Sequence, residues 1–295
     1  MDERRFVDAH GVEVFCRWWP IADPAGVVLI AHGASEHSGR YDRFARALND
    51  AGLMAVALDH RGHGLTGRAE PRKAVMGSGG GAAVVDDLHE LRMQVRAEVG
   101  DDVPLVLFGH SMGSLIALGY LVDHAEGLAG AVLCGFPTDL DHVDALAAGL
   151  QGAADAGHRD EPVDVLAQSN APFEPARTPY DWLSRDPDEV DRYIADPMCG
   201  DDNPLTYGYL LDLFEVLGPA RSGFGSIGCP VLVIAGDRDP AAGMGANPTK
   251  LAATLRAAGV DTALTLYPGA RHELLNETNR DEVTADVIDW LRGVT

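Results

Sequence analysis

Lysine is scarce in this chain. Of 23 basic residues only Lys73 and Lys250 are lysines, against 45 acidic residues, and the formal net charge is −22. A surface of this sign repels phosphate backbones and anionic lipid headgroups, which argues against nucleic acid as a partner and against binding to an anionic membrane surface. A salty habitat and the base composition of the source genome explain such a surface equally well.

Cysteines and long apolar runs are also few. The cysteines are scattered without metal-type spacing, so we expect buried thiols in a reducing compartment and a cytoplasmic protein; they are Cys16, Cys134, Cys199 and Cys229. Because no apolar run reaches about 18 residues, we expect no transmembrane helix and no stable membrane insertion. The charged start, residues 1–5, is not followed by an apolar segment, which predicts no secretory signal.

Apolar residues nevertheless make up 46% of the 295 residues, enough for one large domain or one domain with an insertion. Apolar or alternating runs predict strands at 12–16, 26–31, 53–58, 103–108, 128–134, 230–235 and 262–267. Helical spacing of apolar residues predicts helices at 41–49, 84–95, 114–122, 250–258 and 281–291. Strands that alternate with helices predict an α/β fold with a mostly parallel central sheet flanked by helices.

The alternation stops between residues 138 and 225. This stretch shows helical pieces but no strand signal, and Asp186–Glu189 reads as a helix start with an aspartate cap and proline in the first turn. It holds 18 acidic and 5 basic residues. We predict a helical cap inserted at 138–225, which divides the core into 1–137 and 226–295. The alternative is an ordinary run of helices in one layered fold.

The motif Gly109-His110-Ser111-Met112-Gly113 joins the predicted strand 103–108 to the predicted helix 114–122. A G-x-S-x-G sequence between a strand and a helix is typical of a nucleophile elbow, in which the serine stands on a strained turn. Glycines are needed there because side chains on both sides of the serine would crowd the backbone. Ser111 is therefore the candidate nucleophile.

A serine hydroxyl needs a base, and the base needs a carboxylate to orient it. Where the serine stands on a G-x-S-x-G elbow, the chain order of such a triad is serine, acid, histidine. His272 follows the strand 262–267 and is the only histidine after the acid loop, so it is the candidate base. Asp237 and Asp239 both follow the strand 230–235, and aspartate is also a common turn former, so these residues alone leave the acid open.

The oxyanion of an acyl-transfer reaction needs two backbone N–H donors. The residue after the nucleophile, Met112, supplies one of them. The second comes from the loop after the strand 26–31, and Ala34 is the expected donor because Gly33 lets the backbone turn there.

These segments together resemble the monoacylglycerol lipase and lysophospholipase group of α/β-hydrolases over nearly the whole chain. The matching motifs are His32-Gly33-Ala34, His37-Ser38-Gly39-Arg40-Tyr41, Asp59-His60-Arg61-Gly62-His63-Gly64, Gly109–Gly113, Gly236-Asp237-Arg238-Asp239 and Gly269-Ala270-Arg271-His272-Glu273. The resemblance implies the α/β-hydrolase fold and selects Asp239 over Asp237 as the acid. It also supports Ala34 and Met112 as oxyanion donors.

Several other histidines and one tryptophan are further candidates for a functional role. His60 and His63 have the wrong spacing for a metal pair, so we predict a structural turn there, no metal site and no cofactor. His37 is expected either to hold its loop by hydrogen bonds or to touch substrate. His110 is expected to pack away from the serine hydroxyl. Trp182 is a cap aromatic expected in the cap core or in the substrate pocket.

The sequence therefore predicts a serine esterase that forms an acyl-enzyme on Ser111 with a small-molecule ester. A monoacylglycerol, a lysophospholipid or another short- or medium-chain ester all suit the motifs, and the acidic cap argues against the membrane docking common among family caps. A peptidase, an amidase or a thioesterase with the same triad is the alternative, and a ligand-binding relative without turnover is a further one. A dehalogenase or epoxide hydrolase is disfavoured, because those relatives carry aspartate at the position of Ser111.

Overall fold

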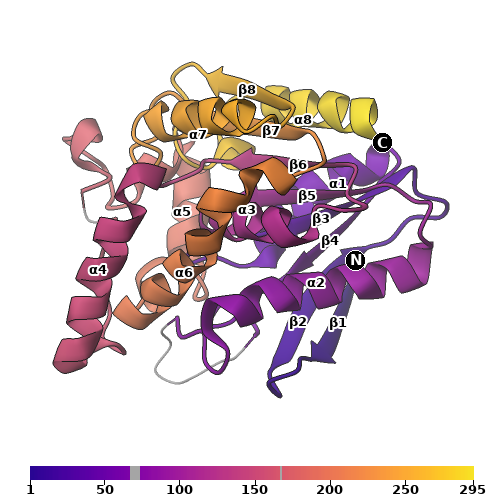
Figure 1. Cartoon of the computed structure of the whole chain (residues 1–295). Helices are drawn as coiled ribbons and strands as arrows, with labels where there is room; N and C mark the ends of the chain where they lie inside the picture. The colour runs from indigo at the N-terminus through magenta and orange to yellow at the C-terminus, as the bar shows by residue number, and fades with distance from the viewer. Residues whose placement is uncertain (67–73, 167) are drawn as a thin grey trace.

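An eight-stranded sheet with helices on both faces is the framework of the protein (Figure 1). The computed structural model describes residues 1–66, 74–166 and 168–295. The strands are β1 (Asp2–Val7), β2 (Glu13–Trp19), β3 (Gly26–Ala31), β4 (Leu53–Leu58), β5 (Leu105–His110), β6 (Gly130–Cys134), β7 (Val231–Gly236) and β8 (Thr262–Tyr267). They lie in the order β1-β2-β4-β3-β5-β6-β7-β8, and all neighbours from β4 to β8 are parallel. The mostly parallel sheet predicted from the sequence is confirmed.

Successive side chains of each strand point to opposite faces of the sheet, and an apolar core lies on each face. In β5, Leu105 and Leu107 join one cluster, whereas Val106 and Phe108 join the other. The first cluster is covered by α2 (Gly80–Val99), α3 (Met112–His124), α6 (Tyr207–Gly223) and α7 (Ala246–Ala257). The second is covered by α1 (Asp42–Asp50) and α8 (Arg280–Val294). Burial on both faces explains why these strands read as continuous apolar runs.

The strand β1 is a feature that the sequence analysis misses. It pairs antiparallel with β2 at the edge of the sheet, from Asp2↔Trp18 to Val7↔Glu13. Of its six residues only Phe6 is buried, and four are charged. An edge strand covered by charges gives no hydrophobic signal, and such charges also protect the edge from pairing with other chains.

Between β6 and β7 the chain forms helices and short turns. The longer helices are α4 (Val143–Ala153), α5 (Pro187–Ala195) and α6, and no strand occurs in 138–166 or 168–225. As predicted, Asp186 caps α5, with its carboxylate accepting a hydrogen bond from the Asp188 N–H at 3.0 Å. Tyr209, Leu210, Leu213 and Leu217 of α6 belong to the same cluster as residues of α2 and α3, so this segment shares a core with the sheet. The division of the chain at 138 and 225 into core and cap stays a prediction.

Among residues 1–66, 74–166 and 168–295, no helix combines the length and the apolar character that crossing a bilayer demands.

Candidate active site

Ser111 occupies the sharp turn between β5 and α3. Its φ of 51° and ψ of −119° are strained for a residue with a side chain. The flanking glycines permit the close packing: a Cβ at Gly109 would lie 2.4 Å from the Gly113 carbonyl oxygen, and one at Gly113 would lie 2.1 Å from the Ala31 carbonyl oxygen. The Ser111 N–H donates to the carbonyl of Cys134 at 2.9 Å, which ties the turn to β6. The strand, turn and helix predicted around this motif are therefore present.

His272 forms a buried pair with Asp239. The distance from His272 Nδ1 to Asp239 Oδ2 is 2.8 Å, and Asp239 is 0% exposed. The other oxygen of Asp239 accepts a hydrogen bond from the Ala242 N–H at 3.1 Å. Asp237 instead accepts from the Gly269 N–H at 2.7 Å and so braces the turn before His272. Of the two acids considered from the sequence, Asp239 is the one in contact with the histidine.

The sheet brings Ser111 and His272 to the same edge, at the carboxyl ends of β5 and β8. Gly135 follows the residue that accepts the Ser111 N–H, and a Cβ at Gly135 would lie 3.4 Å from the His272 ring. In the described part of the chain no hydrogen bond joins the Ser111 hydroxyl to His272. Such hydrogen bonds are commonly long without substrate and tighten in the Michaelis complex.

The two expected oxyanion donors share one cavity with the serine. Ser111, Met112 and Ala34 all line a cavity of about 410 Å³. Met112 is the first residue of α3, so its N–H has no partner within the helix. The remaining walls are mainly apolar, with Thr138, Gln168 and Ser169 as polar exceptions. The apolar lining residues are Leu115, Pro137, Leu146, Leu150, Val165, Leu166, Leu205, Leu210, Leu213, Phe214, Pro240 and Ala241. A polar serine at one end of an apolar cavity suits the acyl group of an ester.

Glu36 is a buried carboxylate that fixes the backbone of the predicted oxyanion loop. It accepts hydrogen bonds from the Gly33 N–H at 2.6 Å, from the Tyr41 hydroxyl at 2.9 Å and from Arg40 at 2.8 Å. His110 Nδ1 lies 3.2 Å from it. Burial alone would raise the pKa of Glu36, but the charge of Arg40 and the hydrogen bond to His110 hold this pKa well below its ordinary value.

Arg40 and His110 extend this network to the loop that carries His272. Arg40 donates to both carboxylate oxygens of Glu273, and His110 Nε2 lies 3.3 Å from the His272 carbonyl oxygen. Burial would lower the pKa of Arg40, but Glu273 and Glu36 raise it well above its ordinary value. Burial would likewise lower the pKa of His110, but the hydrogen bond to Glu36 and its charge raise it. His110 thus contacts Glu36 and the His272 carbonyl as a member of a buried ionic network. That it packs away from the serine hydroxyl stays a prediction.

The sequence analysis does not predict roles for Glu36, Arg40 and Glu273. A signal for them exists, because Glu36 and Arg40 are spaced i,i+4 within the oxyanion loop and Glu273 follows the candidate base. Arg40 and Glu273 are 233 residues apart in the sequence, and local patterns do not reveal a contact over such a separation.

His37 and Trp182, the two side chains that the sequence suggests for substrate contact, line different cavities. His37 Nε2 is 2.9 Å from Asp196, and His37 Nδ1 accepts from the Gly39 N–H at 3.1 Å, so this side chain holds its loop. His37 lines a separate cavity of about 270 Å³. Trp182 is buried with its ring 5.0 Å from that of His272. It lines a second cavity of about 410 Å³.

A cluster of three histidines lies behind the oxyanion loop. His32 contacts the Gly33 carbonyl through Nδ1 at 2.7 Å and accepts from the His60 N–H through Nε2 at 2.9 Å. The rings of His60 and His63 lie 4.5 and 5.5 Å from the His32 ring. Burial, with the neighbouring His32, lowers the pKa of His63 to about 3 and that of His60 well below its ordinary value. Both residues lie in a turn, with their rings neutral and buried.

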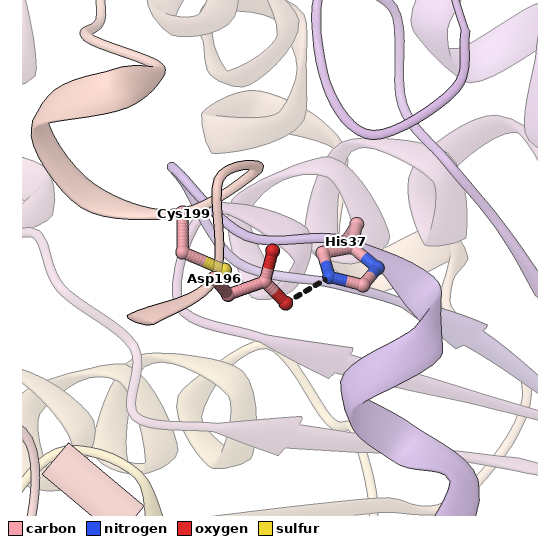
Figure 2. Close-up of side chains that lie close together, drawn as sticks. All are labelled: His37, Asp196 and Cys199. Carbon is pink, nitrogen blue, oxygen red and sulfur yellow. Dashed lines mark hydrogen bonds and ion pairs between the residues drawn. The ribbon is translucent and has the colours of Figure 1, made fainter. Parts of the chain in front are cut away.

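Among residues 1–66, 74–166 and 168–295, one group of side chains has donor atoms close enough together to share a metal ion. It consists of His37, Asp196 and Cys199, whose donor atoms all lie within 4.8 Å of one another (Figure 2). The group lies outside the cavity that Ser111 lines.

Comparison with known proteins places the chain in a family. Residues 22–279 match the family described as serine aminopeptidase, S33. The chain is 33% identical to a monoacylglycerol lipase of Mycolicibacterium smegmatis over 98% of its length and 96% of that protein. It is 30% identical to the human monoglyceride lipase, over 97% of this chain and 88% of that protein. A thermostable carboxyl esterase from Bacillus coagulans in complex with glycerol matches with a TM-score of 0.89 at 30% identity, over 99% of this chain and 98% of that one. The chain therefore belongs to the S33 family of α/β-hydrolases, in its monoacylglycerol lipase-like group.

Proposed function

We propose that this protein hydrolyses carboxylic esters through an acyl-enzyme on Ser111, with monoacylglycerols as the substrate class. The observation that carries the proposal is the cavity of about 410 Å³ that joins Ser111, Ala34 and Met112 to mainly apolar walls. The relatives named monoacylglycerol lipase and the esterase bound to glycerol support a glycerol ester.

In the proposed reaction His272 takes the proton of the Ser111 hydroxyl while its oxygen attacks the ester carbonyl. Asp239, 2.8 Å from Nδ1, keeps the ring proton on that nitrogen and leaves Nε2 free to act as the base. The N–H groups of Ala34 and Met112 hold the oxyanion, and each such donor contributes roughly 10²–10³ in kcat. His272 then protonates the departing alcohol, and a water molecule releases the acid by the same steps in reverse order.

The acyl group is expected in the cavity and the alcohol on its open side. Leu146 and Leu150 of α4 and Phe214 of α6 line this cavity, so the segment between β6 and β7 sets the acyl length. This assignment gives the predicted cap at 138–225 a role in selecting the substrate.

A peptidase acting on a free amino terminus is the second candidate. The specific observation in its favour is the cavity of about 410 Å³ beside Trp182, which Asp164 and Asp201 also line. A carboxylate that reaches the bound substrate would pair with its amine. The family description as serine aminopeptidase points the same way.

The setting proposed for this enzyme is the cytoplasm. All four cysteines are buried free thiols, which suits a reducing compartment.

A hydrolysis panel tests the proposal. Monoacylglycerols of increasing acyl length, a lysophospholipid and an aminoacyl anilide are offered to the protein and to Ser111→Ala. We expect turnover of monoacylglycerols that Ser111→Ala loses by about 10⁴–10⁶ in kcat. Preference for the anilide would establish the second candidate instead, and turnover that survives Ser111→Ala would reject both.

A further inference from the structure

The chain after α5 is docked on the loop that carries Ala34. Asp196 and Cys199 lie three residues apart in a turn closed by the hydrogen bond from the Cys199 N–H to the Asp196 carbonyl at 3.0 Å. The next residue, Gly200, donates its N–H to the Ser35 carbonyl at 3.0 Å. The turn thereby brings a carboxylate and a thiol beside His37 of the loop (Figure 2).

The three side chains lie close enough together to supply three of the four ligands of a tetrahedral ion. Their donor atoms lie within 4.8 Å of one another. Around Zn²⁺, bonds of about 2.0–2.3 Å place neighbouring ligand atoms roughly 3.4–3.6 Å apart. His37 Nε2 and Asp196 Oδ2, now 2.9 Å apart, need to separate only slightly to reach that spacing.

Burial and access also suit a bound ion. His37 and Cys199 are 6% and 3% exposed, so two of the donors are shielded from water. The cavity of about 270 Å³ lined by His37 and Asp196 leaves a path to the site and room for a water molecule as fourth ligand. Three arginines line the same cavity, and each is paired with a carboxylate: Arg40 with Glu36 and Glu273, and Arg43 and Arg192 with Glu189.

We propose that His37, Asp196 and Cys199 bind a thiophilic divalent cation, with Zn²⁺ as the best match. One imidazole, one carboxylate and one thiolate are a donor set that zinc accepts and that Mg²⁺ and Ca²⁺ do not select. The proposal is independent of the ester hydrolysis proposed for Ser111, because none of the three residues lines that cavity.

Binding rearranges protons in a defined way. The Nε2 proton of His37, now directed at Asp196, moves to Nδ1 so that Nε2 can ligate, and the Gly39 N–H loses its acceptor. The Cys199 thiol releases its proton to solvent, so each ion bound liberates one proton. The charges of Asp196 and the thiolate then cancel that of the ion.

A bound ion would link the turn at 196–199 to the loop at 32–41. Because the ion contacts residues from both segments only in the folded protein, it stabilises the folded state and raises Tm with ion concentration.

Cobalt(II) is a suitable probe because a bond from thiolate to Co²⁺ gives a charge-transfer absorption in the near ultraviolet. Metal-free protein, its Cys199→Ser and Asp196→Asn variants, and Cys229→Ser as a matched control are titrated with CoCl₂ and then with ZnCl₂. Cys229 is also a buried free thiol, in a different part of the fold.

We expect one Co²⁺ per chain with the charge-transfer band, displaced by Zn²⁺, and a rise of Tm with ZnCl₂. Cys199→Ser should lose the band, Asp196→Asn should bind at least tenfold more weakly, and Cys229→Ser should match the parent. Absence of the band in the parent protein, or an equal band in Cys199→Ser, would overturn the proposal. The Tm of each variant without metal shows whether it is folded, so a lost band is not mistaken for unfolding.

Discussion

Arg40 and Glu273 form a two-fold hydrogen-bonded ion pair, with Nη2 2.7 Å from Oε2 and Nη1 2.5 Å from Oε1. Arg40 belongs to the loop that holds Ala34, and Glu273 follows His272 in the chain. The pair therefore connects the loop of the proposed oxyanion donor to the loop of the proposed base. Its members are only 11% and 6% exposed, so each charge is stabilised mainly by the other, and that of Arg40 also by Glu36.

Removal of Arg40 should strongly destabilise the protein. Arg40→Ala leaves Glu273 buried without a counter-charge and Glu36 with only His110 as a partner, and breaking such a buried pair costs about 3–5 kcal/mol. Arg46→Ala is the matched control, because its pair with Asp42 is 70% and 42% exposed, so its loss should change stability little. Denaturant unfolding measures both, and equal effects of the two substitutions would show that the buried pair is not structurally important.

The two aspartates after β7 should differ sharply in their effect on catalysis. Asp239→Asn removes the charge that orients His272 and should lower kcat by about 10⁴. Asp237→Asn retains an oxygen for the Gly269 N–H, so its kcat should stay within about tenfold of the parent. Hydrolysis of a p-nitrophenyl ester measures both, with Tm as the test of folding. A larger loss at Asp237 would reverse the assignment.

Acid should destabilise the fold through its buried histidines. In the folded state the pKa of His63 is about 3, against an ordinary value of 6.5, so the ring stays neutral there while the unfolded chain takes up a proton. The stability that this residue contributes is complete above about pH 6.5 and declines as the pH falls toward 3, with a loss of about 2 kcal/mol by pH 5.

Unfolding at pH 7 and pH 5 measures this loss. His63→Gln should reduce the difference in unfolding free energy between the two pH values by about 2 kcal/mol relative to the parent. His142→Gln changes a side chain that is 72% exposed and should leave the difference unaltered. If His63→Gln shows the full acid loss, this histidine is not held neutral in the folded state.

A larger side chain on α4 should shorten the preferred acyl chain. Leu146 lines the Ser111 cavity, and Leu146→Trp would exclude the distal part of a long acyl group. Losing burial of three methylene groups costs about 2.4 kcal/mol, or roughly 50-fold in kcat/KM for long monoacylglycerols. Short esters should be unaffected. Met93→Trp on α2, at a residue 50% exposed, is the control and should leave the chain-length profile unchanged. A profile unaltered by Leu146→Trp would place the acyl group elsewhere.

Local sequence patterns predict the central sheet well because its strands are buried on both faces. The predicted bounds of β3, β4 and β8 agree with the structure to the residue. The elbow is equally accessible to prediction, because strand, glycines and helix are contiguous around Ser111. β1 is missed because its residues are mostly charged and exposed at an edge.

Local sequence patterns do not reveal contacts between segments that are far apart in the sequence. Glu36 meets His110 across 74 residues, and Arg40 meets Glu273 across 233. Nothing in the spacing of these residues indicates that their charges are buried together. The same holds for α6, whose packing on α2 and α3 depends on close approaches such as that of Gly81 to the Asp212 carbonyl, where a Cβ would lie at 2.1 Å.

Ser111 is proposed to carry the acyl group during ester hydrolysis. Rapid mixing with a p-nitrophenyl ester, acid quenching and peptide mass spectrometry detect such an acyl-enzyme. We predict a burst of one p-nitrophenol per active chain and an acyl mass increase on the peptide containing Ser111, both absent in Ser111→Ala. An acyl group on another residue, or steady hydrolysis by Ser111→Ala, would contradict it.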